Sequence, residues 1–248
     1  MNTIYVLWLR QLKKSLRSKS RIIGGLSQPI IFLFAFGFGF SSIFQKAGEG
    51  NYIQFLVPGI IAMSVLFSSV FSGIDVIWDR QFGSLKETLV APVSRMEIMI
   101  GRTLGGATIS IFQGFVILLV STFLGFKIES LMAVLGVLLF VFLIAVMFTS
   151  FGTAIASVLE DMQGFQLIMN FLIMPLFFLS GAMFSISGLP NFMKTLVKIN
   201  PLSYGVDGIR GVLTGIYQFG FAMDLMVLLA VTSIFLIIGS YLFSKIEV

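Results

Sequence analysis

Long apolar runs without charge alternate with short charged segments along the chain. Between charged residues, the uncharged runs cover 22–45, 50–74, 103–126, 130–159, 162–193 and 225–244. A helix that rises about 1.5 Å per residue needs roughly 20 apolar residues to cross a bilayer, and each run supplies them. The pattern predicts an all-α integral membrane protein with six transmembrane helices, near 22–45, 52–78, 96–126, 131–157, 163–184 and 224–244.

One stretch of the first run resembles a strand. Phenylalanine occupies every second position from Phe32 to Phe40. Membrane barrels, however, are built from repeated short segments of alternating polarity, whereas the other runs are continuously apolar. We therefore reject a barrel and interpret 1–248 as a single helical membrane domain.

Residues 1–21 form an amphipathic pattern. At about 100° per residue, one arc is apolar and the opposite arc is basic. The apolar arc holds Tyr5, Trp8, Leu9, Leu12 and Leu16, and the basic arc holds Arg10, Lys13, Lys14 and Arg17. This pattern predicts a helix lying on the inner membrane surface, where it would bind anionic lipid, contact a cytoplasmic partner, or do both.

Composition and charge support this topology. The 248 residues are 57% apolar and 11% charged, which excludes an ordinary soluble protein. The net charge of +5 comes from 16 basic and 11 acidic residues, and eleven of the basic residues lie on the side that carries the termini. Because cytoplasmic loops carry the basic excess, both termini are expected in the cytoplasm of a multi-pass protein of the plasma (inner) membrane. The excess therefore does not indicate a nucleic-acid partner.

The segment 79–95 is the substantial cytoplasmic loop between spans. It holds two capping-box patterns, in which Ser84 precedes Glu87 and Ser94 precedes Glu97 by three residues. Pro92 lies between them and should end the first helix. The pattern predicts a short helix at 85–91, a turn, and a span that begins near Arg95. Such an element could be a mere connector or could transmit force from a docked protein.

On the outer side, 185–222 is apolar but interrupted by glycine, proline and charge. Pro190 can begin one short helix and Pro201 another, and Asp207 and Arg210 are spaced to pair across one turn. Neither helix is long enough to span, so both are expected to be re-entrant. The segment is either a gate on the exit side or a packed lid.

Two spans carry polar stripes at helical spacing, and these stripes are candidates for lining a pathway or for helix packing. The second span contributes Ser64, Ser68, Ser72 and Asp75, and the fifth contributes Gln163, Gln166 and Asn170, with Pro175 expected to bend the helix beyond them. Gly101 and Gly105, like Gly211 and Gly215, match the small-residue spacing of membrane helix contacts, although 25 glycines make chance matches expected.

Several chemistries are missing from the sequence. The chain has no Cys and no His, which removes thiolate nucleophiles, imidazole bases and the usual metal sites. No G-x-x-x-x-G-K-[ST] phosphate loop is present either. We therefore expect no catalytic residue, metal or cofactor in this chain.

Two motifs make the chain similar to the membrane subunits of ABC exporters of the type-2 permease family. The first runs from Asp79 to Glu87 as DRQFGSLKE and is followed by APVSR at 91–95. The second is Leu189-Pro190, then PLSY at 201–204, with Arg210 six residues on. The motif FLVPG at 55–59 and the six predicted spans agree, so the likeness covers nearly the whole chain.

The resemblance implies roles for both loops. The segment 79–95 would hold a coupling helix that rests on a separate ABC ATPase, which binds ATP and Mg²⁺, and two copies of each subunit, with the permease as a homodimer, would form the exporter. The coupling residues would be Asp79, Arg80, Gly83, Leu85, Lys86, Glu87, Pro92 and Arg95. The outer gate would contain Pro190, Pro201, Tyr204, Asp207 and Arg210.

The resemblance implies export driven by the ATPase. The substrate is expected to be amphipathic, lipid-linked or drug-like, because the spans are rich in Phe and Met and carry few charges. The alternative is a secondary transporter or channel that needs no ATPase, but this requires coupled ionisable groups or inverted repeats that the sequence does not display. A non-transporting scaffold is a third hypothesis.

Overall fold

The computed structural model describes residues 3–40, 52–83, 88, 93–128, 130–159 and 161–246, which form helices and no strand. The first half contains α1 (Thr3–Arg17), α2 (Lys19–Gly39), α4 (Tyr52–Ser72), α5 (Ile74–Gln81) and α7 (Arg95–Phe123). The second half contains α8 (Leu131–Val158), α9 (Met162–Ile168), the π-helix η1 (Met169–Ile173), α10 (Met174–Phe178), the 3₁₀ helix η2 (Ile186–Gly188), α11 (Asn191–Ile199), α12 (Pro201–Thr214) and α13 (Phe221–Ser244).

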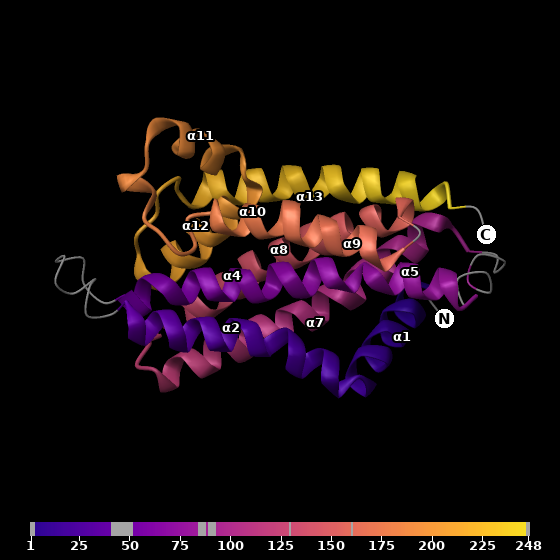
Figure 1. The fold of residues 1–248 in the computed structure, drawn as a ribbon, viewed down its shortest axis with the longest axis horizontal. Coiled ribbons are helices and arrows are strands. Elements are labelled where there is room, and N and C mark those ends of the chain that lie inside the picture. Colours follow the sequence, from indigo (N-terminus) through magenta and orange to yellow (C-terminus); the bar gives the residue numbers. More distant parts are fainter. Residues whose placement is uncertain are drawn as a thin grey trace.

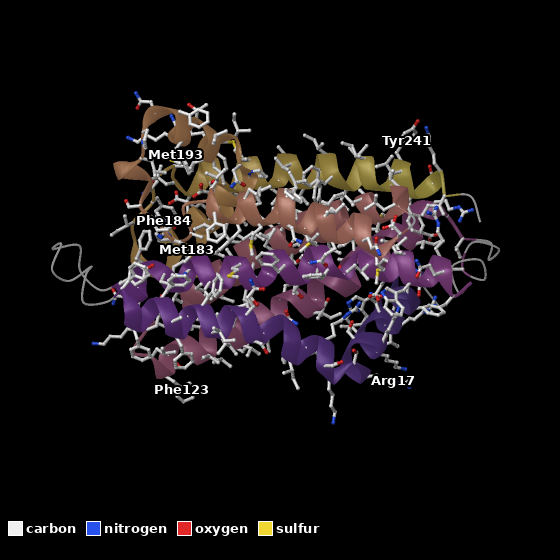
Figure 2. All side chains as sticks on the ribbon, in the orientation of Figure 1. Arg17, Phe123, Met183, Phe184, Met193 and Tyr241 are labelled. Atoms are coloured by element: carbon white, nitrogen blue, oxygen red, sulfur yellow. The ribbon has the colours of Figure 1, made fainter. Side chains whose placement is uncertain are left out.

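Five helical segments of the described residues are long and apolar enough to cross a bilayer. They are Lys19–Gly39, Tyr52–Gln81, Arg95–Phe123, Leu131–Val158 and Phe221–Ser244. Large apolar side chains such as Phe123 and Tyr241 project outward from the bundle (Figure 2) and are 90% and 58% exposed. An apolar exterior of this kind is typical of a surface that faces lipid, so the chain is a multi-pass membrane protein.

The fifth predicted span, 163–184, is shorter in the structure than the sequence indicates. The apolar helix there covers Met162–Phe178 and contains the π-turn η1 just before Pro175, which has no N–H to continue the regular ladder. It ends at Phe178, and Gly181 in the turn that follows adopts a left-handed conformation, with φ of 74°. Apolar residues continue through this turn, so the pattern alone overstated the helix, and a count of six long spans is not reproduced.

The helices form one elongated bundle with two distinct ends (Figure 1). Both chain termini lie at one end, here called the terminal end, and α11 and α12 lie at the other, here called the cap end. Helix α4 runs through the middle and packs on α2, α7, α8 and α12, whereas α13 packs mainly on α8 and α12. The N-terminal helix α1 meets α2 at a sharp bend and packs against α7.

A close helix crossing lies near the terminal end, where α4 gives way to α5. A Cβ at Gly73 would lie 2.3 Å from the carbonyl oxygen of Gly152 on α8, and a Cβ at Gly152 would lie 2.5 Å from that of Val70. Only glycine allows the two backbones to approach this closely. The crossing holds α5 against α8 and so fixes where the carboxylates of α5 lie.

Candidate functional site

Five charged side chains gather at the terminal end of the bundle. We call this group the ion cluster, and it consists of Lys14, Arg21, Asp75, Asp79 and Arg102. The residues come from α1, α2, α5 and α7, so the cluster ties together four helices that are distant in sequence. Three cations face two carboxylates.

Asp75 is the most buried member of the cluster, with 2% of its surface exposed. Arg21 donates to both carboxylate oxygens, at 2.9 and 3.0 Å, and the Lys14 ammonium lies 3.1 Å away. The side-chain amide of Gln11 donates a further hydrogen bond. The sequence placed Asp75 on a polar stripe toward the inner surface. The structure instead makes it a paired charge inside the protein.

Asp79 occupies the same face of α5 one turn later. Its carboxylate pairs with Arg102 of α7 and accepts a hydrogen bond of 3.1 Å from Lys14. Lys14 therefore bridges both carboxylates. Because Arg102 is only 7% exposed, Asp79 is its compensating charge as well as a contact between helices.

The other predicted coupling residues extend from this cluster. Arg80 donates to the carbonyl oxygen of Leu159 at 3.4 Å, which joins α5 to the end of α8. Gly83 follows α5 with φ of 78°, a left-handed conformation that favours glycine after a helix. Arg95 is the first residue of α7. The remaining members lie outside the described residues, namely Leu85, Lys86, Glu87 and Pro92.

The start of α7 confirms one prediction about helix ends. Ser94 accepts a hydrogen bond of 3.1 Å from the backbone N–H of Glu97, and the Glu97 carboxylate accepts one of 3.0 Å from that of Ser94. This is the capping box expected from the spacing. The companion pattern at Ser84 and Glu87 lies outside the described residues.

The N-terminal helix has a third face that the amphipathic pattern did not indicate. Gln11 and Ser15 are buried, and the indole of Trp8 donates to the hydroxyl of Thr108 at 3.0 Å. A Cβ at Gly105 would lie 2.5 Å from the Cβ of Gln11, so the glycines of α7 make room for α1. The Gly101–Gly105 spacing, which seemed a chance match, is a real helix contact.

A link also runs from α1 to the loop before α7. The guanidinium of Arg10 donates to the hydroxyl of Thr88 at 3.1 Å. Thr88 is a described residue within the predicted coupling segment and is 9% exposed. Thus α1 contacts both the ion cluster and the segment that the sequence assigns to coupling.

The two predicted pathway stripes have different surroundings. Ser64 is buried, the Ser68 hydroxyl lies 3.0 Å from that of Ser110, and Ser72 donates to the carbonyl oxygen of Ser69 at 2.7 Å. Part of this stripe packs α4 against α7. Gln163, Gln166 and Asn170 instead lie on an exposed face of α9 and η1.

The cap end is organised by main-chain contacts. Pro190 precedes α11, and Pro201 is the first residue of α12, with Asn200 capping that helix through a 3.0 Å bond to the N–H of Leu202. The Tyr204 hydroxyl donates to the carbonyl oxygen of Lys198 at 2.8 Å. These bonds fold α11 back on α12.

Asp207 and Arg210 do not pair with each other, contrary to the spacing argument. The Asp207 carboxylate accepts hydrogen bonds of 2.8 to 2.9 Å from the backbone N–H groups of Gln218 and Phe219. Arg210 donates to the carbonyl oxygen of Gly181 at 2.9 Å, and its guanidinium lies 4.1 Å from the ring centre of Phe55.

Burial lowers the pKa of Arg210 to about 10, although the negative charge of Asp207 opposes this change. The guanidinium therefore still carries its charge at neutral pH. Its contacts reach the start of α4 and the turn after α10, so Arg210 connects three segments of the cap end.

The basic residues that pair with Asp75 and Asp79 at the terminal end were not predicted from the sequence. Lys14, Arg21 and Arg102 were interpreted as topology signals, yet the first two lie 65 and 54 residues from the carboxylates they bind. No local spacing predicts such contacts. Among the described residues, no group of His, Cys, Asp and Glu could hold a metal ion.

Comparisons with known proteins identify one matching family and several relatives. A family model described as ABC-2 type transporter matches residues 2–214. The putative transport permease ycf38 of Cyanophora paradoxa is 31% identical over 214 residues, which cover 84% of this chain and 72% of the relative. Nodulation protein J of Rhizobium leguminosarum bv. trifolii is 27% identical, with coverage of 85% and 78%. The inner membrane transport permease YadH of Escherichia coli is 31% identical, with coverage of 64% and 62%.

Proposed function

Because the chain belongs to the ABC-2 type transporter family, and is therefore a membrane permease subunit rather than an enzyme, we propose that it forms the translocation path of an ATP-driven exporter. Its substrate would be amphipathic, lipid-linked or drug-like and would move outward. A separate ABC ATPase would bind and hydrolyse ATP with Mg²⁺.

The ion cluster is the observation that carries this proposal. Asp75 and Asp79 lie on α5, which leads directly into the segment 84–92, and their partners lie on α1, α2 and α7. A push on that segment would therefore reach three other helices through charged contacts that can exchange partners. From this cluster together with the motifs at 79–87 and 91–95, we assign coupling to Asp79, Arg80, Gly83, Leu85, Lys86, Glu87, Pro92 and Arg95.

The direction of the chain supports the proposed topology. Both termini lie at one end of the bundle, which requires an even number of crossings (Figure 1). Five long helices give an odd number, so we propose Met162–Phe178 as the sixth crossing, since 17 residues reach the lower limit of span lengths. The terminal end, with its basic residues, would face the cytoplasm, and α11 and α12 would form a re-entrant outer gate.

An exposed polar face supports a second copy of the permease. Gln163, Gln166 and Asn170 are exposed along an otherwise apolar helix. Amide groups are costly against lipid, because hydrocarbon offers them no hydrogen-bond partner. We propose that this face meets the other permease of a homodimer or the path between the two copies, together with the part of the Ser64, Ser68 and Ser72 stripe that remains accessible.

Reconstitution with a candidate ABC ATPase from the same organism tests the proposal. We expect the purified permease to bind the ATPase and to change its rate of ATP hydrolysis in proteoliposomes. Glu87→Ala should reduce this change at least fivefold, whereas Lys127→Ala, an exposed lysine on the opposite side, should leave it within twofold. A chain that binds no ATPase and moves solute without ATP would instead be the secondary transporter or channel.

A further inference from the structure

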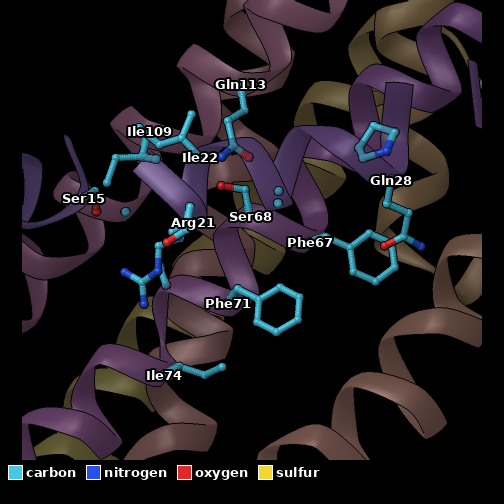
Figure 3. A pocket seen from close by; sticks show the side chains of 16 residues that line it. Ser15, Arg21, Ile22, Gln28, Phe67, Ser68, Phe71, Ile74, Ile109 and Gln113 are labelled. Carbon is cyan, nitrogen blue, oxygen red and sulfur yellow. The ribbon is translucent and has the colours of Figure 1, made fainter. Parts of the chain in front are cut away.

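A pocket of about 390 Å³ opens beside the bend between α1 and α2 (Figure 3). Its walls come from the start of α2, from α4 and from α7. The volume lies in the range of small-molecule sites. Ser68 and Ser72 of the first polar stripe line this pocket, so the stripe has an accessible part as well as a packed part.

One side chain that lines the pocket, Gln113, has a buried hydrogen-bond acceptor without a donor. Gln113 is 2% exposed, and its amide oxygen has no hydrogen-bond partner. A buried polar atom without a partner is costly, so a ligand that supplies one gains binding energy. Gly25 leaves room for this amide, since a Cβ there would lie 2.9 Å from the Gln113 nitrogen.

The charged groups beside the pocket are engaged in ion pairs, although the ion cluster holds one more cation than carboxylates. Arg21 lines the mouth, but its two terminal nitrogens bind the Asp75 carboxylate at 2.9 and 3.0 Å. Asp75 in turn faces two cations, Lys14 and Arg21. An anionic ligand would have to displace Asp75 from Arg21, and a cationic ligand would have to compete with Lys14 and Arg21 for Asp75, so the pocket favours an uncharged ligand.

The remaining polar groups of the pocket favour a ligand that carries hydroxyl groups. The Ser72 hydroxyl donates to the carbonyl oxygen of Ser69 and so keeps only acceptor capacity for a ligand. Figure 3 shows the Gln113 amide and the Ser68 hydroxyl pointing toward the same part of the pocket. A hydroxyl both donates and accepts, and so can satisfy an amide and a serine at once.

The other side of the pocket is apolar. Phe67 and Phe71 of α4 and Pro29 of α2 line it, and Phe71 is 37% exposed toward the outside of the bundle. An alkyl chain attached to a head group at Gln113 could leave the pocket past these rings and enter lipid.

We propose that this pocket binds the uncharged, hydroxyl-bearing head group of an amphipathic molecule, with its apolar chain leaving along Phe67 and Phe71. As a statement of substrate class, this inference rests on the proposed function. Gln113 and Ser68 hold the head group, and the ion pairs that already engage Arg21 and Asp75 select against charged amphiphiles.

Photolabelling of the full chain in lipid nanodiscs tests the site. The probe is a decyl glucoside with a photoreactive group in its chain, and labelled peptides are identified by mass spectrometry. We expect label on α2, α4 and α7 around the pocket. Unlabelled decyl glucoside should suppress it at tenfold lower concentration than decyl sulfate or decyltrimethylammonium. Equal competition by the three compounds would overturn the proposal.

Two variants add independent tests. Gln113→Leu should reduce labelling at least fivefold without lowering the unfolding temperature, because it removes an unpartnered polar group. Gly24→Leu should also reduce labelling, since Gly24 lines the pocket and an added Cβ meets nothing within 4 Å. Gly39→Leu is the matched control, because Gly39 on the same helix has equally open surroundings outside the pocket. Unchanged labelling in the first two variants refutes the site.

This test separates the two proposals, since labelling requires no ATPase. If labelling of the pocket is absent or unspecific while the chain still stimulates the ATPase, only the proposal of a head-group site is refuted. Specific labelling of a chain that no ATPase recognises would overturn only the exporter function.

Discussion

The two ends of the bundle stabilise their charged residues in different ways. At the terminal end, Asp75 and Asp79 pair with side chains from α1, α2 and α7. At the cap end, Asp207 and Arg210 bind backbone N–H and carbonyl groups instead. A buried charge needs a partner at either end, but the nature of the partner determines what can move.

This difference has a mechanical meaning. Side-chain pairs between separate helices can exchange partners, and Lys14 already contacts two carboxylates. Arg210 instead attaches α12 to main-chain atoms of Phe55 and Gly181, so these segments must move together. The terminal end is thus suited to change its contacts, and the cap end to move as a unit.

The strongest test of the comparison removes one carboxylate of the ion cluster. Asp79→Ala leaves the buried Arg102 without its close countercharge and should lower the free energy of unfolding by about 3–5 kcal/mol. Chemical unfolding in detergent micelles measures the loss. The double variant Asp79→Ala with Arg102→Met should recover at least half of it, because the unpaired charge is gone. A loss below about 1 kcal/mol in the single variant would contradict charge pairing as the main role of Asp79.

The cap end should respond less strongly and without dependence on salt. Arg210→Met removes the hydrogen bond to Gly181 and the contact with the Phe55 ring, at a cost of about 2–3 kcal/mol. We expect this cost to stay the same between low and high salt, because the partners are backbone groups. Lys198→Met, an exposed lysine on α11, is the control and should cost little. A strongly salt-dependent effect would show that Arg210 acts through charge pairing.

A third test disturbs the packing of α1 against α7 with a larger side chain and changes no charge in the ion cluster. Gly105→Val would press on Gln11 and should destabilise the contact of α1 with α7 by about 1–3 kcal/mol. Limited proteolysis should then cut within α1 at least fivefold faster. Gly39→Val, where an added Cβ meets nothing within 4 Å, should leave the cleavage rate unchanged. Equal rates in the two variants would refute the close packing of α1.

The smallest expected effect compares helix caps at the two ends. Ser94 caps α7 at the terminal end, and Ser130 caps α8 through a 3.1 Å bond to the N–H of Ala133. Ser94→Ala and Ser130→Ala should each cost about 1 kcal/mol in unfolding free energy. Only Ser94→Ala should also weaken stimulation of the ATPase, because this cap adjoins the coupling segment. If both variants lose stimulation equally, the loss reflects the general stability of the protein and not the position of Ser94 beside the coupling segment.

Local patterns predicted some features of the structure well. Apolar runs identified the long helices, and the spacing of Ser94 and Glu97 identified a capping box, because both depend on residues that are neighbours in the chain. The same reasoning failed at Gly181. The helix before it ends at Phe178 and the chain turns through Gly181, whereas composition alone would have continued the helix.

The sequence by itself determined the class of the protein, its long helices and the motifs of its loops, because hydrophobicity and helix capping act over a few residues. Only the tertiary structure decided that Lys14, Arg21 and Arg102 hold the carboxylates of α5, and that Gln113 faces a pocket without a partner. These contacts join residues that are brought together when the helices pack, and neither charge nor spacing along the chain encodes them.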